Sequence, residues 1–464
     1  MAGAERTERG PLAHDLRDFL SSPRELWLAY VVWYVESLGI FSMLYTLVLW
    51  LSVDFGYDDQ GAANWATAFS GGASICMLAA GFLGDSIGLR RGLVGAFGLL
   101  AVGRFLMGFA GGRAAATTGL MVMCVGYACV VPVLNTAFRR YSHPRSRPFA
   151  FSIYYVVMNI GAASAGFLVD ACRKPFLSMD GKRLVQKTVV LPWVGERTLS
   201  AYRMVFLLGA ALAAVAFLLT LLLREGVDTE GPLPSENPEP KARPRPPWQI
   251  AAEVVREDAF WRFMLLMGLL VFVRMIFQHG NFTLPKYALR ELGESFPIGK
   301  FQAVNPIAII FLAPLAAALT RHLPAFRVLL VGSAISATSV FVLVLPASYV
   351  TIATFFVLLA IGEALWSPRS YEIAATIAPR GRESSYMGLS QLPFFLGKLG
   401  ALPMSGWLLS RYCPAVGPRD SAKMWTIIGL TTVLAPILMF LLRGVIDPKA
   451  PEGSTPRAVG LKIP

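Results

Sequence analysis

Five ionisable side chains lie inside long apolar stretches of this 464-residue sequence: Glu36, Arg104, Arg274, Glu363 and Lys398. Removing a charge from water is costly unless a partner or trapped water compensates it, so each of these groups is a candidate for binding a charged solute or carrying a proton. Glu363 is the first candidate for both roles, because it is the fourteenth residue of an apolar stretch that begins near position 350. Glu36 is the second candidate for carrying a proton.

The same residues also allow structural interpretations. Glu363 could form an ion pair with Arg274 or Lys398, and these two cations could bind an anionic solute or serve as counter-ions for that acid. Glu36 could be a buried, hydrogen-bonded acid. Arg104 is expected to donate to backbone carbonyl groups or to extend towards the membrane surface. The residues themselves leave these alternatives open.

The elements that must position these residues are membrane-spanning helices. Of all residues 55% are apolar and only 15% are charged, which is too few charges for the surface of a soluble chain of this length. A helix needs roughly 20 apolar residues to cross the hydrocarbon core, and the alternation typical of a transmembrane barrel is missing. The sequence predicts an all-α membrane protein with twelve spans, at about 26–52, 62–84, 91–111, 114–137, 148–171, 202–224, 259–281, 301–320, 325–346, 350–371, 384–410 and 422–443.

A proline-rich polar segment divides these spans into two groups of six. Residues 225–258 contain seven prolines between positions 232 and 247 together with charges of both signs, and such a composition cannot form a buried core. We therefore expect an N-terminal six-helix bundle at 26–224, a linker at 225–258 and a C-terminal six-helix bundle at 259–443. Polar tails are expected at 1–25 and 444–464.

The distribution of basic residues predicts the orientation. Lys and Arg are more frequent in the two tails and the even-numbered loops than in the other loops, and the first odd-numbered loop holds Asp54, Asp58 and Asp59 without a base. The positive-inside rule then places both termini in the cytoplasm of a multi-pass protein of the cell inner membrane. These loops and anionic membrane lipid explain the net charge of +13, so no nucleic-acid partner is expected.

The residue types typical of enzymes and metal sites form no pattern in this chain. A phosphate-binding loop and paired metal-binding histidines are missing, and the four histidines are scattered. Three of the five cysteines lie inside apolar stretches and are expected to pack there. Whether Cys172 and Cys413, near predicted outer loops, form a disulfide is left open. We expect no enzyme activity, no metal and no cofactor.

One polar loop has the residues that a conformational gate needs. It reads Gly81-Phe82-Leu83-Gly84-Asp85-Ser86-Ile87-Gly88-Leu89-Arg90-Arg91. Gly81 and Gly88 permit close helix approach and a tight turn, and Asp85 can accept bonds from a helix N-terminus or pair with a base such as Arg90 or Arg91. The loop resembles the signature loop of the major facilitator superfamily, whose contacts form in one state and break in the other. The alternative is an ordinary loop with positive-inside arginines.

Further stretches are similar to the proton-dependent oligopeptide transporter family within that superfamily. They are Gly126 to Asn135, Phe151-Ser152 with Tyr155, Asn159 and Gly161, then Asn305-Pro306 with Pro314, and finally Gly362-Glu363 with Ser367-Pro368 and Glu372. These stretches occur in the same order as in the family, and the resemblance covers nearly the whole chain. It implies a monomeric secondary transporter that moves a small solute by alternating access.

The resemblance also implies roles for individual residues. Asn159 matches a family residue that contacts substrate, Glu363 matches an acid that binds a substrate amine, and Asn305 is a further substrate-binding candidate. The implied function is proton-coupled symport of a peptide-like or amino-bearing solute, with protons carried by Glu36 and Glu363. The alternative is a proton-driven exporter or facilitator of a metabolite or drug-like compound. A receptor or membrane-bound transferase is disfavoured, because a large soluble appendage and an intramembrane catalytic cluster are missing.

The first and fourth spans depart from the family pattern. The family's first span carries Glu-x-x-Glu-Arg, of which this chain keeps only Glu36, with Ser37 in place of the arginine. Val131 stands where the fourth span usually has a lysine. In the family these residues couple protons and hold a peptide carboxylate. Arg274 and Lys398 are therefore the candidates for binding an anionic group in this chain.

Overall fold

The computed structural model describes residues 19–80, 88–143, 146–181, 183–191, 195–227, 229, 258–377 and 392–446. Within these ranges the chain is almost entirely helical. Its named strands there are the antiparallel pair β1 (Lys187–Leu191) and β2 (Gly195–Leu199), which lie between the fifth and sixth long helices. The predicted all-α fold class is confirmed.

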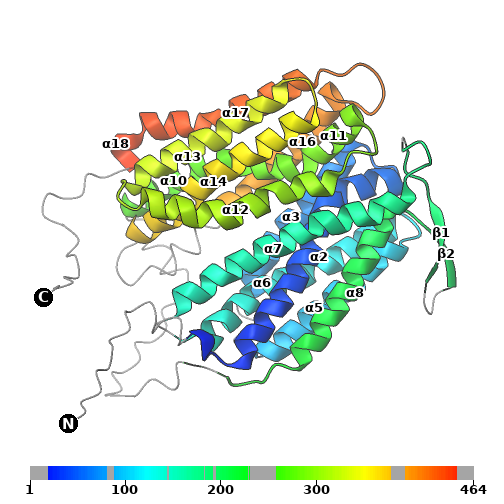
Figure 1. The fold of residues 1–464 in the computed structure, drawn as a ribbon, viewed down its shortest axis with the longest axis horizontal. Helices are drawn as coiled ribbons and strands as arrows, with labels where there is room; N and C mark the ends of the chain where they lie inside the picture. The colour runs from blue at the N-terminus through cyan, green and yellow to red at the C-terminus, as the bar shows by residue number, and fades with distance from the viewer. Residues whose placement is uncertain are drawn as a thin grey trace, which may run out of the picture.

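The long helices form two bundles, one from each half of the chain (Figure 1). The N-terminal bundle contains α2 (Arg24–Phe55), α3 (Asp59–Ala80), α5 (Leu89–Phe109), α6 (Arg113–Tyr141), α7 (Arg147–Arg173, followed by the short η1, Lys174–Phe176) and α8 (Ala201–Leu221). The C-terminal bundle contains α10 (Asp258–Gln278) with η2 (His279–Thr283) and α11 (Leu284–Leu292), α12 (Ile298–Thr320), α13 (Ala325–Ser339) with η3 (Val340–Val344), α14 (Tyr349–Ile377), α16 (Leu392–Tyr412), α17 (Ser421–Leu441) and α18 (Arg443–Ile446).

Ten helices in the described part of the chain are long and apolar enough to cross a membrane. The two remaining long helices are α3 and α16, which pack against each other across the two bundles. α3 is rich in Gly, Ala and Ser. Because much of its surface meets protein rather than lipid, small and weakly polar side chains are favourable there.

Span seven extends beyond the predicted end at residue 281. α10 continues through the π-helix η2 into α11, so that the apolar helix covers Phe260–Leu292. The sequence prediction ended early because Lys286 and Arg290 interrupt the apolar pattern. The structure keeps both bases in the helix by pairing them with Asp59 of α3. The π-turn also frees the Gly280 carbonyl, which accepts a bond of 2.7 Å from the Gln302 amide of α12.

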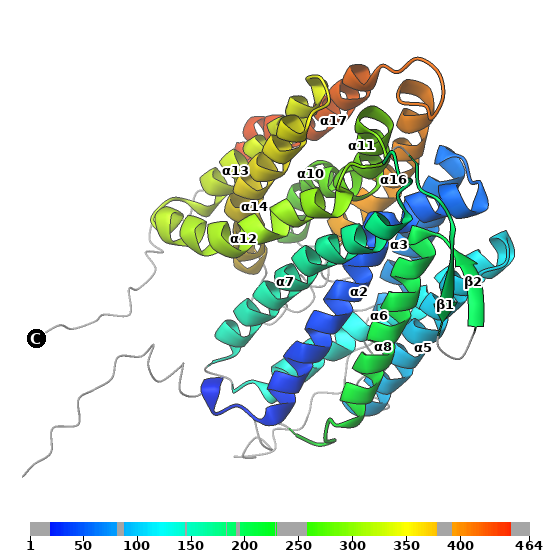
Figure 2. The ribbon, with the colours of Figure 1, turned by 45° about the vertical axis from the view of Figure 1, so that its right-hand side comes forward.

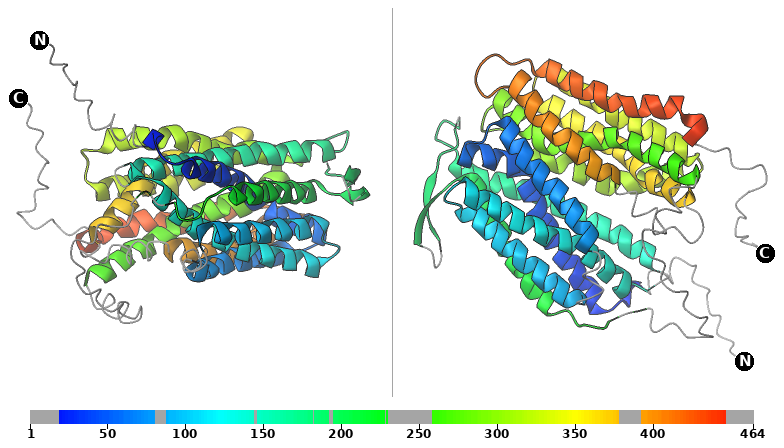
Figure 3. Two further views of the ribbon diagram at one scale, coloured as in Figure 1. Left: turned by 90° about the horizontal axis from the view of Figure 1, so that it is seen from below. Right: turned by 180° about the vertical axis from the view of Figure 1, so that it is seen from behind.

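The two bundles meet at one end of the molecule and diverge at the other. They approach at the end that carries β1 and β2, which we call the hairpin end, and separate towards the end where α2 begins and α17 finishes, which we call the terminal end (Figures 2 and 3). At the hairpin end, Gly166 of α7 lies so close to Gly299 of α12 that a Cβ atom on either residue would overlap the other's carbonyl group. Both positions therefore require glycine.

Candidate solute site and gate

The structure places Glu36 and Arg104 in a closed ion pair inside the N-terminal bundle. Arg104 Nη2 lies 2.8 Å from Glu36 Oε1, and Arg104 Nη1 lies 3.1 Å from Glu36 Oε2. Both side chains are completely buried. Arg104 Nη1 also donates to the Gly209 carbonyl of α8, as expected for a base that bonds the backbone. The bidentate pairing with Glu36 was not foreseen from the sequence.

Two glycines make room for this arginine. A Cβ atom at Gly39 would lie 2.7 Å from Arg104 Nη1, and one at Gly209 would lie 3.3 Å from Arg104 Cδ. The guanidinium therefore occupies space that α2 and α8 leave open by lacking side chains. The pair joins α2, α5 and α8, and it has the geometry of a structural clamp.

Glu363 lies near the middle of α14 and is only partly buried. Its Oε2 atom accepts a bond of 3.1 Å from the Asn305 amide of α12, and Arg274 of α10 is the charged group that interacts with it. Three of the predicted site residues are thus brought together. The Arg274 guanidinium stacks on the Trp366 ring, with Cζ 4.7 Å from the ring centroid.

This acid lies next to the seam between the bundles. Tyr155 of α7 packs against a small apolar cluster formed by Ile309, Ala360 and Ala364 of the C-terminal bundle. Ala360 and Ala364 flank Glu363 on the same helix. Glu363 is therefore close to the surface along which the two bundles can move.

Lys398 lies at the same seam, on α16. Its neighbour Gly397 packs against α10, and its other neighbour Leu399 lies 3.3 Å from the position of a Cβ atom at Gly71 of α3. The ionisable group that interacts with its ammonium is the Cys124 thiol of α6, in the opposite bundle. Among the described residues, no carboxylate and no hydrogen-bond acceptor pairs with it.

Asn159 is nearly buried on α7. Its Nδ2 atom donates to the Tyr155 carbonyl of the same helix at 2.9 Å. Within the described part of the chain, no contact joins its side chain to Glu363 or Lys398. The structure therefore places it on the seam-facing helix α7 and leaves its predicted contact with solute as an expectation.

A first latch closes the hairpin end. Lys286 Nζ donates to Asp59 Oδ1 at 2.8 Å and to Ser52 Oγ at 2.6 Å, and Arg290 Nη2 donates to Asp59 Oδ1 at 2.6 Å. One carboxylate of the N-terminal bundle thus holds two bases of span seven. The sequence prediction missed this latch, because Asp59 was read as a loop residue.

A second latch joins α7 to the start of α12. Asp170 accepts bonds from the backbone N–H groups of Gly299 (2.9 Å) and Lys300 (2.8 Å). Arg173 donates to the carbonyls of Phe296 and Glu294, both at 2.9 Å. Burial raises the pKa of the Glu294 carboxyl, which lies in the loop before α12, while the Arg173 charge opposes that rise.

Span seven also holds a buried histidine that the sequence analysis set aside. His279 Nδ1 is 2.8 Å from Thr283 Oγ1, which donates to Ser405 Oγ of α16 at 2.6 Å. His279, Thr283, Lys286 and Arg290 are spaced by four, three and four residues and therefore share one helix face. That spacing was a signal in the sequence for a polar stripe leading to the first latch.

The predicted gating loop lies largely outside the described residues, which exclude Gly81 and Asp85. Gly88 precedes α5 with φ +88°, a left-handed conformation that favours glycine. The backbone N–H of Arg91 donates to Glu225 at 3.3 Å, so an acid beyond the end of α8 stabilises the start of α5. Arg90 and Arg91 lie on the first turn of that helix. The gating role of this loop stays a prediction.

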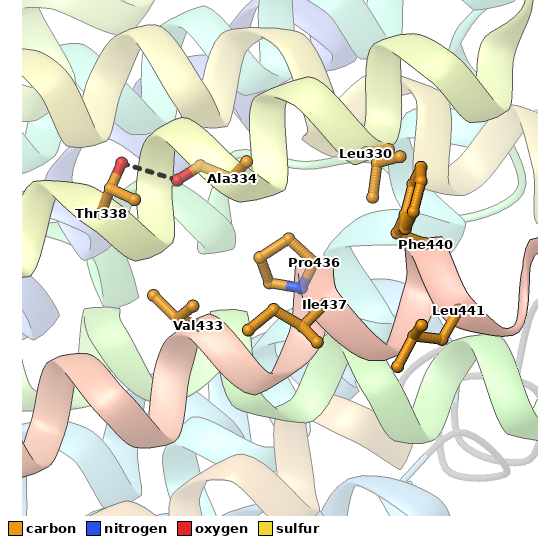
Figure 4. A pocket seen from close by; sticks show the side chains of 8 residues that line it. All are labelled: Leu330, Ala334, Thr338, Val433, Pro436, Ile437, Phe440 and Leu441. Carbon is orange, nitrogen blue, oxygen red and sulfur yellow. Dashed lines mark hydrogen bonds between the residues drawn. The ribbon is translucent and has the colours of Figure 1, made fainter.

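An apolar groove of about 380 Å³ lies between α13 and α17 (Figure 4), and none of these charged residues lines it. Thr338 contributes its hydroxyl, which donates to the Ala334 carbonyl of its own helix at 2.8 Å. The other residues that line the groove include Leu330, Ile437 and Phe440. This groove has no group that could select a charged solute.

The five cysteines are free thiols, Cys172 and Cys413 among them.

These features define a class of protein: a multi-pass helical membrane carrier with two bundles that are latched together at one end. The family model of the Major Facilitator Superfamily matches residues 31–398, and the chain belongs to that superfamily. It is therefore a secondary transporter and not an enzyme. No curated protein matches the chain by sequence.

Solved structures of peptide transporters share this fold. A mutant of the peptide transporter POT superposes with a TM-score of 0.71 at 17% identity, covering 91% of this chain and 95% of its own. A POT family transporter in complex with 5-aminolevulinic acid gives a TM-score of 0.70 at 16% identity, covering 92% and 97%. A POT structure with alafosfalin gives 0.70 at 17%, covering 91% and 95%. The fold thus resembles that of the POT transporters.

Proposed function

We propose that this transporter is a proton-coupled symporter of a small peptide-like or amino-bearing solute, and that Glu363 carries the proton. The observation that supports this role best is the position of Glu363, which is ionisable, partly accessible and next to the seam between the bundles. A carboxyl group there can meet both solute and solvent as the bundles move.

Glu36 fits the proton-carrying role less well than Glu363. Its two carboxylate oxygens are both bonded to Arg104, and neither side chain is exposed. Taking up a proton would leave a buried guanidinium without its counter-ion, which is strongly unfavourable. We therefore propose that proton coupling depends on Glu363 and that Glu36 supports the bundle.

The two latches support alternating access between two sides of a membrane. Both join the bundles at the hairpin end, whereas the bundles diverge at the terminal end (Figure 2). We propose that the terminal end faces the cytoplasm, in agreement with its basic loops. The structure then corresponds to a state that is closed to the outside. Outward opening would require both latches to break.

Transport by purified protein in liposomes tests this proposal. Suitable probes are dialanine and 5-aminolevulinic acid, the latter because a structural neighbour binds it, together with N-acetyl-dialanine, which carries one net negative charge. With an acidic exterior, we expect the wild type to accumulate a probe and to acidify the lumen, as reported by trapped pyranine. Glu363→Gln should lower this accumulation by at least about tenfold.

The matched control is Glu196→Gln on the exposed strand β2, which should transport like the wild type. Uptake by the wild type that ignores the proton gradient would rule out coupling for these probes. Faster probe efflux from loaded vesicles under the same acidic exterior would instead support the alternative, proton-driven export, because protons would then enter as the probe leaves.

A further inference from the structure

The charges in the middle of the described spans do not balance. Glu36 is neutralised by Arg104 in a closed pair. Glu363 is compensated by Arg274 and by the Asn305 amide. Lys398 has no counter-ion among the described residues, because none of the described acids pairs with it. Counted over the described residues, the site between the bundles therefore carries one excess positive charge.

The surroundings of Lys398 offer it little compensation. Gly397 and Leu399 hold this turn of α16 against α10 and α3, so the lysine emerges where three helices meet. The interacting group across the seam is the Cys124 thiol, whose Sγ already donates to the Phe69 carbonyl. A neutral thiol does not cancel an ammonium charge. A charge kept at membrane depth without a protein counter-ion indicates a ligand of opposite sign.

We infer that the transported solute has one net negative charge and that its anionic group binds the Lys398 ammonium on α16. The inference rests on the proposed transport of a small solute and names its charge class. A carboxylate, sulfonate or phosphonate would meet the requirement, because each accepts bonds from an ammonium and supplies the missing charge. A zwitterion would leave the excess charge of the site uncompensated.

Binding to a matched series of dialanine derivatives tests the charge class. The probes are N-acetyl-dialanine (net charge −1), dialanine (zwitterion), dialanine amide (net charge +1) and N-acetyl-dialanine amide (neutral), with succinate and propylphosphonate as other anions. Thermal unfolding of the purified full chain is measured at constant ionic strength, because a ligand that binds the folded state raises Tm. We expect the anions to stabilise the wild type more strongly than their uncharged or cationic analogues.

Variants of Lys398 test the residue. Lys398→Gln should weaken the affinity for anions by about 10- to 100-fold, whereas Lys398→Arg should retain most of it. The matched control is Lys423→Gln, which removes an exposed lysine at the start of α17 and should bind like the wild type. Unchanged anion affinity in Lys398→Gln, stronger binding of the zwitterion or the amides, or no stabilisation by any anion would each overturn the inference.

This experiment is independent of proton coupling, because binding is measured without a gradient. Anion binding through Lys398 combined with gradient-independent uptake would reject the proposed coupling and keep the inference. Proton-driven uptake of the zwitterion by a fully active Lys398→Gln variant would do the reverse.

Discussion

Among the described residues, the five charged groups in the middle of the spans divide into two compensated sets and one excess cation. Arg104 donates two hydrogen bonds to the Glu36 carboxylate, and both side chains are buried, so the two charges neutralise each other. Glu363 and Lys398 lie at the seam and are partly accessible. A buried charge is informative only together with its partners, because a closed pair stabilises the fold and an open charge can bind a ligand.

Removing one member of the closed pair should destabilise the protein. Glu36→Leu leaves the Arg104 guanidinium buried without a counter-ion, and we expect it to lower the free energy of unfolding by about 3–5 kcal/mol. The double variant Glu36→Leu/Arg104→Met should recover most of this loss, because both charges are gone. Unfolding in detergent, followed by intrinsic fluorescence, measures the effect.

Arg24→Met is the control for this prediction, since Arg24 pairs with Glu25 while largely exposed and its pair is expected to contribute less than about 1 kcal/mol. A Glu36→Leu variant as stable as the wild type would show that Arg104 does not depend on Glu36.

At the scale of elements, α12 depends on the opposite bundle for its N-terminal cap. The residue before its first turn is Pro297, whose side chain cannot accept a hydrogen bond. Asp170 of α7 supplies the cap instead, through the N–H groups of Gly299 and Lys300. This cap exists only while the hairpin end is closed, so helix capping contributes to the equilibrium between the two states.

Asp170→Ala should therefore shift the protein towards opening at the hairpin end. Loss of a cap of about 1 kcal/mol corresponds to roughly a fivefold change in the ratio of open to closed molecules. Pulsed electron spin resonance between labels at the exposed residues Val190 and Val416, one in each bundle, should show a larger fraction of long distances.

The control is Asp420→Ala, which removes a cap from within the same bundle, where Asp420 accepts from the N–H of Lys423 at the start of α17. It should leave the distance distribution unchanged. An equal shift in both variants would mean that the cap supplied by Asp170 from the opposite bundle (the trans cap) has no special role.

For the whole molecule, closure at the hairpin end requires two backbones to touch. Gly166 and Gly299 meet without side chains between α7 and α12, beside the second latch. Interfaces between membrane helices are commonly built on such small residues. The close contact means that the rocking of two bundles can be blocked by a single methyl group.

Gly299→Ala should prevent this closure and impair transport. Its Cβ would overlap the Gly166 carbonyl, and overpacking of this kind costs about 1–3 kcal/mol, which corresponds to roughly a 5- to 150-fold loss of the closed state. Probe exchange across liposomes measures the effect. Gly268→Ala on α10, where a Cβ atom meets no neighbour within 4 Å, is the control. Undiminished exchange by Gly299→Ala would contradict the requirement for contact.

Composition and the length of the apolar stretches predicted the fold class, the twelve spans and the ionisable residues within them. Helix number and position follow from apolar length, because the lipid core admits no other arrangement of such stretches. The proximity of Glu363 to Asn305 and Arg274 was also within reach, since all three stood out as polar groups in apolar surroundings. The end of span seven was misplaced, because Lys286 and Arg290 looked like the start of a loop, and α14 also continues beyond the predicted end of span ten at residue 371.

The interaction partners of these side chains on other helices follow from how the helices pack. The neighbouring sequence does not distinguish Glu36 from Glu363, because both are single acids in apolar helices. Glu36 nevertheless forms a buried ion pair with Arg104, whereas Glu363 lies at the seam. The trans cap by Asp170 and the solitary position of Lys398 depend on which helices pack together. The physical reason is that a side chain's role in a membrane is set by whether its charge is compensated, and that depends on contacts between residues far apart in the chain.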